Sequence, residues 1–563
     1  MNRFFMLLLF LGGILQAQTD IPTDYFSNPL DIDLVLSGNF GEMRANHFHS
    51  GLDLKTQQKE GLPVFAPADG YVSRIQVQHY GYGKALYILH PNGYTTVYGH
   101  LKSYAGEIEK YVKDTQYKKE TFELELFPDK ALLPVKKGEI IAYAGNTGGS
   151  GGPHLHYEIR DSAQRPMNPL LFGVEIPDTQ KPIMSAVFAY PIGEDAHVNQ
   201  SQNMTKLKLS KQKDGSYKAE NITAFGKIGF GLTTYDQQNG ASNKNGSYKI
   251  KATYNGAEKF EVLFNKFSFS ETRYLNRYTD YNYYESNKSM VQKLFREKNN
   301  PLSIITKEDD NGYVTVADSL NSFYSIQVDD FKGNSMLVSI PIEGKKLEIV
   351  DIKKVEKTDD YIYADHATSL TKGKFSIYIP ANSLYDDTYL KIEAKGDTLK
   401  FHEDLIPIHT NISITADVSS YNEADKDKLY IGRLNYRGLP YYNSTTRSGD
   451  KLTAKTRTFG DYTVASDTTP PTIKPVNFSD GKWISNQNFL QVKITDDLSG
   501  ISSYRATING KFILMEYEYK KNVLTYNFND NVNLESENNL KLIVIDNVGN
   551  SATFEAKFFR KQP

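Results

Sequence analysis

Short segments of alternating apolar and polar residues recur along this chain of 563 residues. Residues 70–77 and 85–89 are early examples, and glycine, proline and asparagine punctuate the chain between such segments. Alternation places the apolar side chains on one face of a strand, and closely spaced turns favour antiparallel pairing. The pattern therefore predicts a protein that is mainly all-β.

One stretch departs from the strand pattern. Between Ser103 and Leu133 apolar residues recur at helical spacing among charged ones, before residues 122–127 alternate again. We expect a short helical insertion over residues 103–134, inside an antiparallel β-sheet domain that spans residues 25–175. Such an insertion could narrow or gate a cleft, which is a hypothesis at this point.

Beyond residue 175 the chain repeats itself in sequence. The matching segments are 178–183 with 467–473, 236–256 with 496–510, and 326–335 with 543–551. This repeat predicts two copies of one Ig-like β-sandwich, over residues 178–345 and 467–563, the first enlarged by an insertion near residues 267–301. A further β-rich domain is expected between them, over residues 346–465. The antiparallel domain would thus be followed by about three β-sandwich domains.

The first residues have the pattern of an export signal. Arg3 precedes an apolar run over residues 4–15, and Ala17 is a small residue at a plausible cleavage point. The alternative is a membrane anchor, but the run is shorter than the roughly 20 residues that span a bilayer. We expect residues 1–17 to be a removed signal peptide and the protein to be periplasmic or extracellular, without stable membrane insertion.

Charge and cysteine content narrow the class of function. The net charge is −2, with 65 basic and 67 acidic residues, so nothing favours nucleic acid as a partner. Cysteine is absent, so an exported chain of this kind is held by packing, and by any metal it binds, instead of disulfides.

Two short histidine motifs carry the candidate chemistry. They are His49-x-x-x-Asp53 and His154-x-His156. Alternate residues of a strand share a face, so each motif presents its polar side chains together. Two imidazoles and one carboxylate make a three-ligand zinc site whose fourth position is free for water, the open arrangement of a catalytic metal. One histidine is then left over for proton transfer.

The segments around these motifs add specificity. Residues 61–70, 81–83, 98–101, 138–141 and 145–154 follow one another in register. Over about residues 38–173 the series closely resembles the lysostaphin- and LytM-type zinc endopeptidases of bacterial cell walls. The resemblance implies that His49, Asp53 and His156 bind one Zn²⁺, and that His100 and His154 are the remaining functional histidines. Which of these two is the general base stays open.

The resemblance also implies a substrate, the peptide cross-links of peptidoglycan. Family members cut either glycine-rich bridges or D-alanyl bonds to a diamino acid, and the absence of a basic wall-binding module favours the second. Two other functions are weighed against hydrolysis. Relatives that have lost zinc ligands act as binding partners that activate other wall hydrolases, and the repeats could instead make an adhesion or scaffolding protein, or dock a protein partner.

Several neighbouring residues have open roles. Arg44 and Arg160 flank the two motifs and could orient a ligand, meet a substrate carboxylate or form surface salt bridges. His47 could approach the metal, although a position behind the metal ligands or on the surface is favoured. The glycine-rich segment 145–152 is interpreted as a flexible rim beside the metal, with a structural turn as the alternative.

Overall fold

The computed structural model describes residues 21–530 and 535–561, so the expected signal peptide lies outside the described residues. The structure is 47% strand and 7% helix, which confirms the all-β fold class. In the described part of the chain, no helix is both long and apolar enough to cross a membrane.

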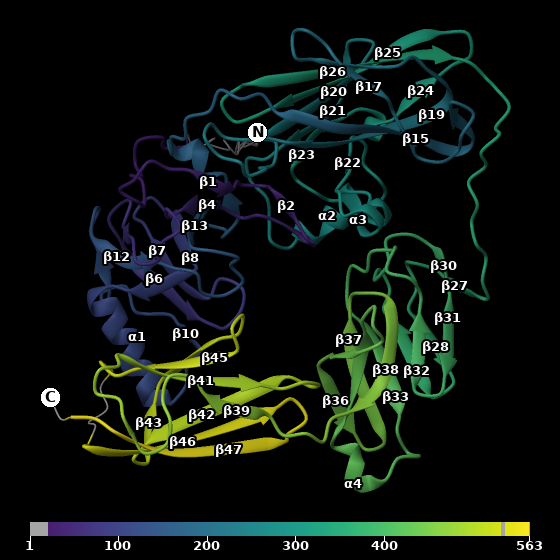
Figure 1. Cartoon of the computed structure of the whole chain (residues 1–563). Helices are drawn as coiled ribbons and strands as arrows, with labels where there is room; N and C mark the ends of the chain where they lie inside the picture. Colours follow the sequence, from purple (N-terminus) through teal and green to yellow (C-terminus); the bar gives the residue numbers. More distant parts are fainter. Residues whose placement is uncertain (1–20, 531–534, 562–563) are drawn as a thin grey trace, which may run out of the picture.

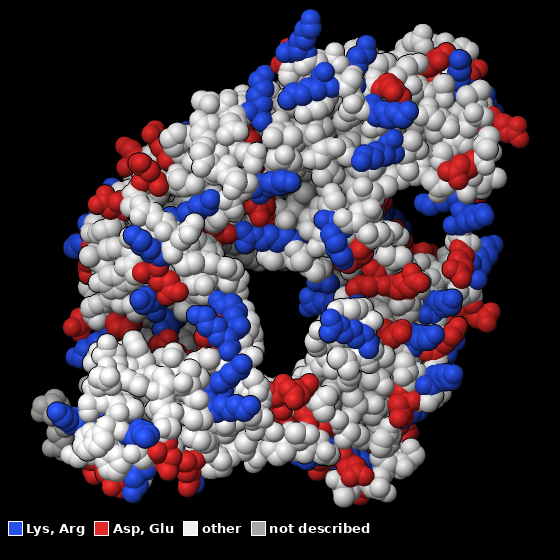
Figure 2. Space-filling model, viewed as in Figure 1, with Lys and Arg blue, Asp and Glu red and all other residues white. Residues whose placement is uncertain are grey.

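Four domains follow one another around a ring (Figure 1). We name them the N-terminal domain (residues 21–175), the first repeat (183–344), the middle domain (359–467) and the last repeat (472–559). The last repeat, drawn in yellow, returns to the N-terminal domain, drawn in purple and blue. A space-filling view shows an opening through the centre of the ring (Figure 2).

The N-terminal domain is built on one large sheet whose strands run in the order β1-β4-β13-β8-β7-β6-β10, and a second sheet has the order β5-β12-β9. Its elements are β1 (Leu36–Gly38), β2 (Met43–Arg44), β3 (His47–Phe48), β4 (Leu52–Lys55), β5 (Pro63–Phe65), β6 (Gly70–Val77), β7 (Lys84–Leu89), β8 (Thr95–Gly99), β9 (Leu101–Tyr104), α1 (Gly106–Lys119), β10 (Leu124–Leu126), β11 (Pro134–Val135), β12 (Ile140–Ala144), β13 (His154–Arg160), β14 (Pro166–Met167) and the 3₁₀ helix η1 (Pro169–Phe172).

Strands β4 and β13 are neighbours in the large sheet, and their register aligns His156 with Asp53. Leu155 and Tyr157 lie on the opposite face of β13 and are completely buried. Burial of this apolar face fixes which side of the strand points into the core, since a shift by one residue would invert it. The two histidine motifs are thereby brought to one place on one face of the sheet.

Helix α1 and strand β10 occupy the stretch in which we expected a helical insertion. Ile108 and Val112 are buried on one side of α1, and acidic residues in its first turn and lysines in its last turn complement the helix dipole. Strand β10 pairs with β6 at the edge of the large sheet. The other side of α1 contacts the last repeat, where Lys113 pairs with Asp530.

The first repeat shares its apolar core with the N-terminal domain, in one cluster that runs from Phe26 to Ile342. Its strands join into a twelve-stranded sheet. Its elements are β15 (Ile183–Val198), β16 (Thr205–Lys206), β17 (Leu209–Lys211), β18 (Tyr217–Ala219), β19 (Ile222–Tyr235), β20 (Lys249–Tyr254), β21 (Ala257–Leu263), η2 (Thr272–Tyr274), α2 (Leu275–Tyr278), α3 (Tyr281–Asn287), β22 (Gln292–Lys293), β23 (Ile305–Glu308), η3 (Asp310–Gly312), β24 (Val314–Val316), β25 (Asn321–Asp329) and β26 (Ser335–Gly344).

The middle domain has two five-stranded sheets around a core of its own. Its elements are β27 (Asp360–Ile362), β28 (Thr368–Lys372), β29 (Phe375–Ile379), β30 (Thr388–Leu390), β31 (Ile392–Lys395), β32 (Thr398–Phe401), β33 (Ile412–Asp417), α4 (Glu423–Lys426), β34 (Leu429–Leu434), β35 (Pro440–Tyr442), β36 (Thr445–Ser448), β37 (Lys451–Thr456) and β38 (Gly460–Ser466). Arg277 of the first repeat pairs with Asp386 of this domain.

The last repeat has a four-stranded and a five-stranded sheet, again with a separate core. Its elements are β39 (Thr472–Pro475), β40 (Lys482–Trp483), β41 (Phe489–Thr495), β42 (Ile501–Ile508), β43 (Lys511–Ile513), β44 (Met515–Glu518), β45 (Val523–Asn527), β46 (Glu537–Asp546) and β47 (Ser551–Phe559). The buried ammonium group of Lys84 in the N-terminal domain lies 2.8 Å from the carboxylate of Glu516. This ion pair helps to close the ring.

Candidate metal centre

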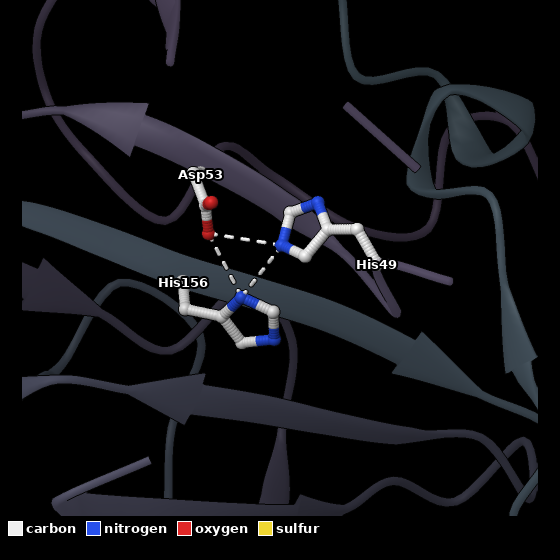
Figure 3. A group of neighbouring side chains, drawn as sticks. All are labelled: His49, Asp53 and His156. Atoms are coloured by element: carbon white, nitrogen blue, oxygen red, sulfur yellow. Dashed lines mark hydrogen bonds and ion pairs between the residues drawn. The ribbon is translucent and has the colours of Figure 1, made fainter. Parts of the chain in front are cut away.

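Three buried side chains from two neighbouring segments converge on one point (Figure 3). Asp53 comes from β4, His156 from the adjacent β13, and His49 from the turn that leads into β4. Oδ1 of Asp53 lies 3.0 Å from Nε2 of His49 and 2.9 Å from Nδ1 of His156. The two imidazole nitrogens are 3.0 Å apart. Three donor atoms grouped this closely suit the ligands of one metal ion.

The remaining ring nitrogens of both histidines are held by hydrogen bonds. Nδ1 of His49 donates to the backbone carbonyl of Asn39 over 2.7 Å, and Nε2 of His156 donates to the carboxylate of Glu158 over 2.8 Å. A ring nitrogen that donates in this way leaves the lone pair on the other nitrogen, the one that faces Asp53. When neutral, both imidazoles are therefore held in the tautomer that a metal ligand requires.

The charges around the site favour an ionised carboxylate and a neutral His49. Burial lowers the pKa of His49. Burial opposes protonation of His156, but hydrogen bonds and attraction from Asp53 and Glu158 raise its pKa to about 9. A metal ion that binds there therefore replaces a proton on this ring. Burial opposes ionisation of Asp53, but the attraction of His49 and the close contacts with His154 and His156 hold its pKa well below the usual range. Arg44 adds to this set, because its Nη2 lies 2.5 Å from Oδ2 of Asp53 and leaves Oδ1 facing the histidines.

His100 and His154 stand beside the three converging residues. Their ring centroids are 4.8 Å apart, and Nε2 of His154 lies 3.4 Å from Oδ1 of Asp53. Nδ1 of His100 donates to the carbonyl of Thr147 and Nδ1 of His154 to that of Gly152, each over 2.8 Å. Each ring therefore has its Nε2 available. Burial, together with repulsion from His156 and His154, lowers the pKa of His100 to about 3.

Local backbone geometry turns His100 towards the site. It lies between β8 and β9 with φ at 59°, the left-handed region that few residues other than glycine adopt. Its backbone N–H donates to the carbonyl of Tyr82 over 2.8 Å, which stabilises the turn. All five residues expected at the site from the sequence are thus brought together.

Glu158 is a member of the site that the sequence analysis missed. It is completely buried, and besides His156 it accepts hydrogen bonds from Ser50, Tyr82 and Arg160. Burial opposes its ionisation, yet Arg160 and His156 lower its pKa. Strand alternation was the available signal, because Glu158 follows His154 and His156 on the same face of β13.

The flanking residues divide between the site and the surface. Arg44 and Arg160 both take part in the network, the first through Asp53 and the second through Glu158. His47 is exposed, and Nδ1 of its ring donates to the carbonyl of Ala45 over 2.9 Å.

An open cleft of about 590 Å³ adjoins the metal-binding group. It is lined by Ser37, Arg44, Asp53, Lys55, Gln57, Gln58, His100 and residues 149–154. The glycine-rich segment forms one rim, and the last repeat holds it from outside, because Nζ of Lys520 donates to the carbonyls of Asn146 and Ser150 over 2.6 and 3.1 Å.

Comparison with known families identifies two parts of the chain. Residues 47–117 and 130–169 match the sequence model of peptidase family M23. The residues between these two segments lie within the expected insertion. Residues 359–467, which form the middle domain, match the sequence model of the Zu5-like domain.

Curated relatives match the chain over a limited length. An uncharacterized metalloprotease of Haemophilus influenzae is 39% identical over 138 residues, which are 24% of this chain and 23% of that protein. The DD-carboxypeptidase/endopeptidase Mpg of Neisseria meningitidis is 33% identical over 148 residues, 26% of this chain and 28% of that protein. The chain thus spans about a quarter of the length of these relatives.

One solved structure is similar to part of the chain. The catalytic domain of lysostaphin from Staphylococcus simulans is 23% identical, with 24% of this chain and 90% of that chain covered and a TM-score of 0.19. The family match confirms the resemblance noted from the sequence over about residues 38–173. The segment that supplies His49, Asp53, His100, His154 and His156 is thus a peptidase family M23 domain, carried in a longer chain of β-rich domains.

Proposed function

We propose that this protein is a zinc-dependent metalloendopeptidase that hydrolyses peptide cross-links of bacterial peptidoglycan. The observation that carries the proposal is the convergence of His49, Asp53 and His156 beside an open cleft that His100 and His154 border. The family match and the names of several relatives, among them the peptidoglycan DD-endopeptidase ShyC of Vibrio cholerae, support it.

The donor set supports zinc as the metal. Two imidazole nitrogens and one carboxylate oxygen are ligands that zinc prefers, whereas Mg²⁺ and Ca²⁺ favour oxygen alone. Ligand atoms around a tetrahedral zinc lie roughly 3.3 Å apart, given bonds of about 2.0–2.1 Å. The three donor atoms here are 2.9–3.0 Å apart. Zinc bound there would supply Lewis acidity that polarises a carbonyl and makes water acidic enough to lose a proton near neutral pH.

His100 and His154 are proposed to act on the substrate and on water. Each anchors its Nδ1 on a backbone carbonyl, so each presents Nε2 as the atom that accepts or donates a proton. One proton must leave the attacking water and one must reach the leaving amine, and the oxyanion between these steps needs a hydrogen-bond donor. We assign the two histidines jointly to these tasks.

The substrate is proposed to be a D-alanyl bond to a diamino acid in the cross-link. Relatives named DD-endopeptidase and DD-carboxypeptidase/endopeptidase support this choice over a glycine bridge. The cleft has room for an extended peptide, and its walls carry amide and hydroxyl groups that can hydrogen-bond to a peptide backbone. We place the enzyme in the cell envelope, exported through the signal peptide proposed at residues 1–17, with the repeats as spacers or docking modules.

Mass spectrometry of defined cross-linked muropeptides digested by the zinc-loaded full chain tests the proposal. We expect monomeric muropeptides from the wild type and none from His154→Ala, while the exposed-residue control His47→Ala keeps wild-type activity. Equal release by wild type and His154→Ala would refute the catalytic assignment. Release of glycine fragments alone would refute the choice of bond. A wild type that releases nothing but activates another wall hydrolase would favour the non-catalytic alternative, which the complete ligand set disfavours.

A further inference from the structure

Two triads of aspartates occupy matching places in the two repeats. The first triad is Asp178, Asp236 and Asp330, and the second is Asp467, Asp496 and Asp546. In each triad the first aspartate comes from the segment that leads into the repeat. The second lies at the end of β19 in the first repeat and of β41 in the last repeat, and the third lies at the end of β25 and of β46, respectively. Within each triad, one carboxylate oxygen per residue lies within 4.8 Å of the others.

The two triads are also held in the same way. Nδ2 of Asn334 donates to Oδ2 of Asp330 over 2.7 Å and to the backbone carbonyl of Asp178 over 3.3 Å. In the last repeat Asn550 repeats both contacts, to Asp546 over 2.7 Å and to the carbonyl of Asp467 over 2.9 Å. The sequence repeat thus preserves a three-dimensional arrangement of acidic groups and not only a strand pattern.

Four of these six aspartates are buried, and Asp178 and Asp496 are half-buried. Asp236 and Asp330 are 6% and 4% exposed, and Asp467 and Asp546 are 0% and 2% exposed. Among the described residues, no lysine, arginine or histidine forms an ion pair with any of the six carboxylates. Burial, together with repulsion from Asp330 and Asp178, raises the pKa of Asp236 to about 7. Buried carboxylates in proteins are normally paired or coordinate a metal.

A neutral oxygen beside the first triad independently points to a ligand. Asn245 is 4% exposed, and its Oδ1 is buried with no hydrogen-bond donor among the described residues, as is Oδ1 of Asp236. Asn245 pairs with Asp236 through two backbone hydrogen bonds and lines, with all three aspartates, a cavity of about 40 Å³. A cavity needs at least about 10–15 Å³ of such space to hold one water molecule, so this one has room for a small ion or water. In the last repeat the hydroxyl of Ser499 is likewise buried without a partner.

We propose that each triad binds one divalent cation, and that this cation is Ca²⁺. Every donor at the two sites is a hard oxygen, from carboxylate, amide or hydroxyl groups, and such oxygens are the ligands of Ca²⁺. Nitrogen donors, which distinguish the zinc centre, are absent from both described groups. The cation would supply the positive charge that the buried carboxylates lack.

The first calcium site is connected to the zinc centre through one loop. The loop over residues 236–247 binds the N-terminal domain through Gln238, which accepts from the N–H of Leu36 over 2.8 Å. In the same loop Gly246 exchanges two hydrogen bonds with the side chain of Asn39, over 2.7 and 2.8 Å. The carbonyl of Asn39 in turn orients His49. A cation at Asp236 therefore fixes a loop that positions a metal ligand, a link to hydrolysis that rests on the proposed function.

Equilibrium dialysis with Ca²⁺, applied to the full chain with zinc bound, tests the sites directly. We expect two Ca²⁺ per chain in the wild type, one in Asp236→Asn, one in Asp496→Asn and none in the double variant. Asp214→Asn and Asp417→Asn are matched controls, because both aspartates are exposed and bind nearby serines in turns, and they should keep two. A wild type that binds no Ca²⁺ in the millimolar range, or that binds only Mg²⁺, would overturn the proposal.

A second measurement guards against variants that misfold. Ca²⁺ should raise the thermal unfolding midpoint of the wild type and slow amide hydrogen exchange at Leu36 and Gly246, and both effects should be lost in Asp236→Asn. No change in either quantity on adding Ca²⁺ to the wild type would contradict the proposal. Calcium binding is measured without substrate, so its failure is distinguishable from failure of the hydrolase assignment.

Discussion

The carboxylate of Glu158 accepts a hydrogen bond from Nε2 of His156 over 2.8 Å, and this contact directs Nδ1 of the same ring towards Asp53. Partners of this kind orient metal ligands and raise their basicity, and their loss typically lowers metal affinity about 10–100-fold. We expect Glu158→Gln to lower zinc affinity by a factor in this range, measured by competition with a chelator. Glu125→Gln, at a partly exposed glutamate of β10, is the control. Unchanged affinity in Glu158→Gln would show that Glu158 does not support the ligand.

The zinc content of variants should distinguish His100 and His154 from the metal ligands. We expect His100→Ala and His154→Ala to keep one zinc per chain and to lose roughly 10²–10⁴-fold in kcat/KM, because each removes a group proposed to transfer protons. Elemental analysis and muropeptide hydrolysis measure the two quantities. Loss of zinc from His154→Ala would instead show that His154 is a metal ligand. This alternative needs a test because Nε2 of His154 lies only 3.4 Å from Oδ1 of Asp53.

Removal of the ligand charge should remove the metal. Asp53→Asn keeps the size of the side chain but loses the negative charge that faces two imidazoles and Arg44. We expect loss of zinc and of hydrolysis, and chelation of the wild type should reproduce both losses, with recovery when zinc is added back. A wild type that hydrolyses muropeptides at full rate after complete chelation would contradict a metal-dependent mechanism.

The rim of the cleft should loosen when its outer support is removed. Lys520→Ala deletes two hydrogen bonds to the carbonyls of Asn146 and Ser150, each worth on the order of 1 kcal/mol. We expect faster amide hydrogen exchange over residues 146–150, while the exposed neighbour variant Lys521→Ala leaves exchange unchanged. Equal exchange in both variants would mean that the last repeat does not restrain the rim.

Strand alternation, the spacing of the histidine motifs and the sequence repeat made part of the fold and of the site predictable. Strand alternation and the spacing of His49, Asp53 and His156 predicted residues that the structure brings together, because register on adjacent strands converts sequence spacing into distance. Strand alternation also places Glu158 on the same face as His154 and His156, although the sequence analysis did not include it. The chain repeat predicted two related β-rich units, and the match of their aspartates was visible in the sequence as landmarks without an assigned role.

Long-range contacts were beyond prediction from the sequence. Nothing near Lys520 in the sequence indicates that it contacts Asn146, since that contact depends on how four domains are arranged. The same holds for Gly246 and Asn39, which lie about two hundred residues apart in the chain. Helix α1 was expected as an insertion, but the contact of Lys113 with Asp530 depends on the return of the last repeat.

Closure of the ring gives the cleft two external supports. The first repeat reaches the His49 side through Asn39, and the last repeat reaches the opposite rim through Lys520. The middle domain joins these two arms, through Arg277 on one side and through the hydrogen bond from Lys428 to Val548 on the other. A mechanical load on the middle domain is therefore transmitted in both directions, and it arrives at the two walls between which a substrate would be held.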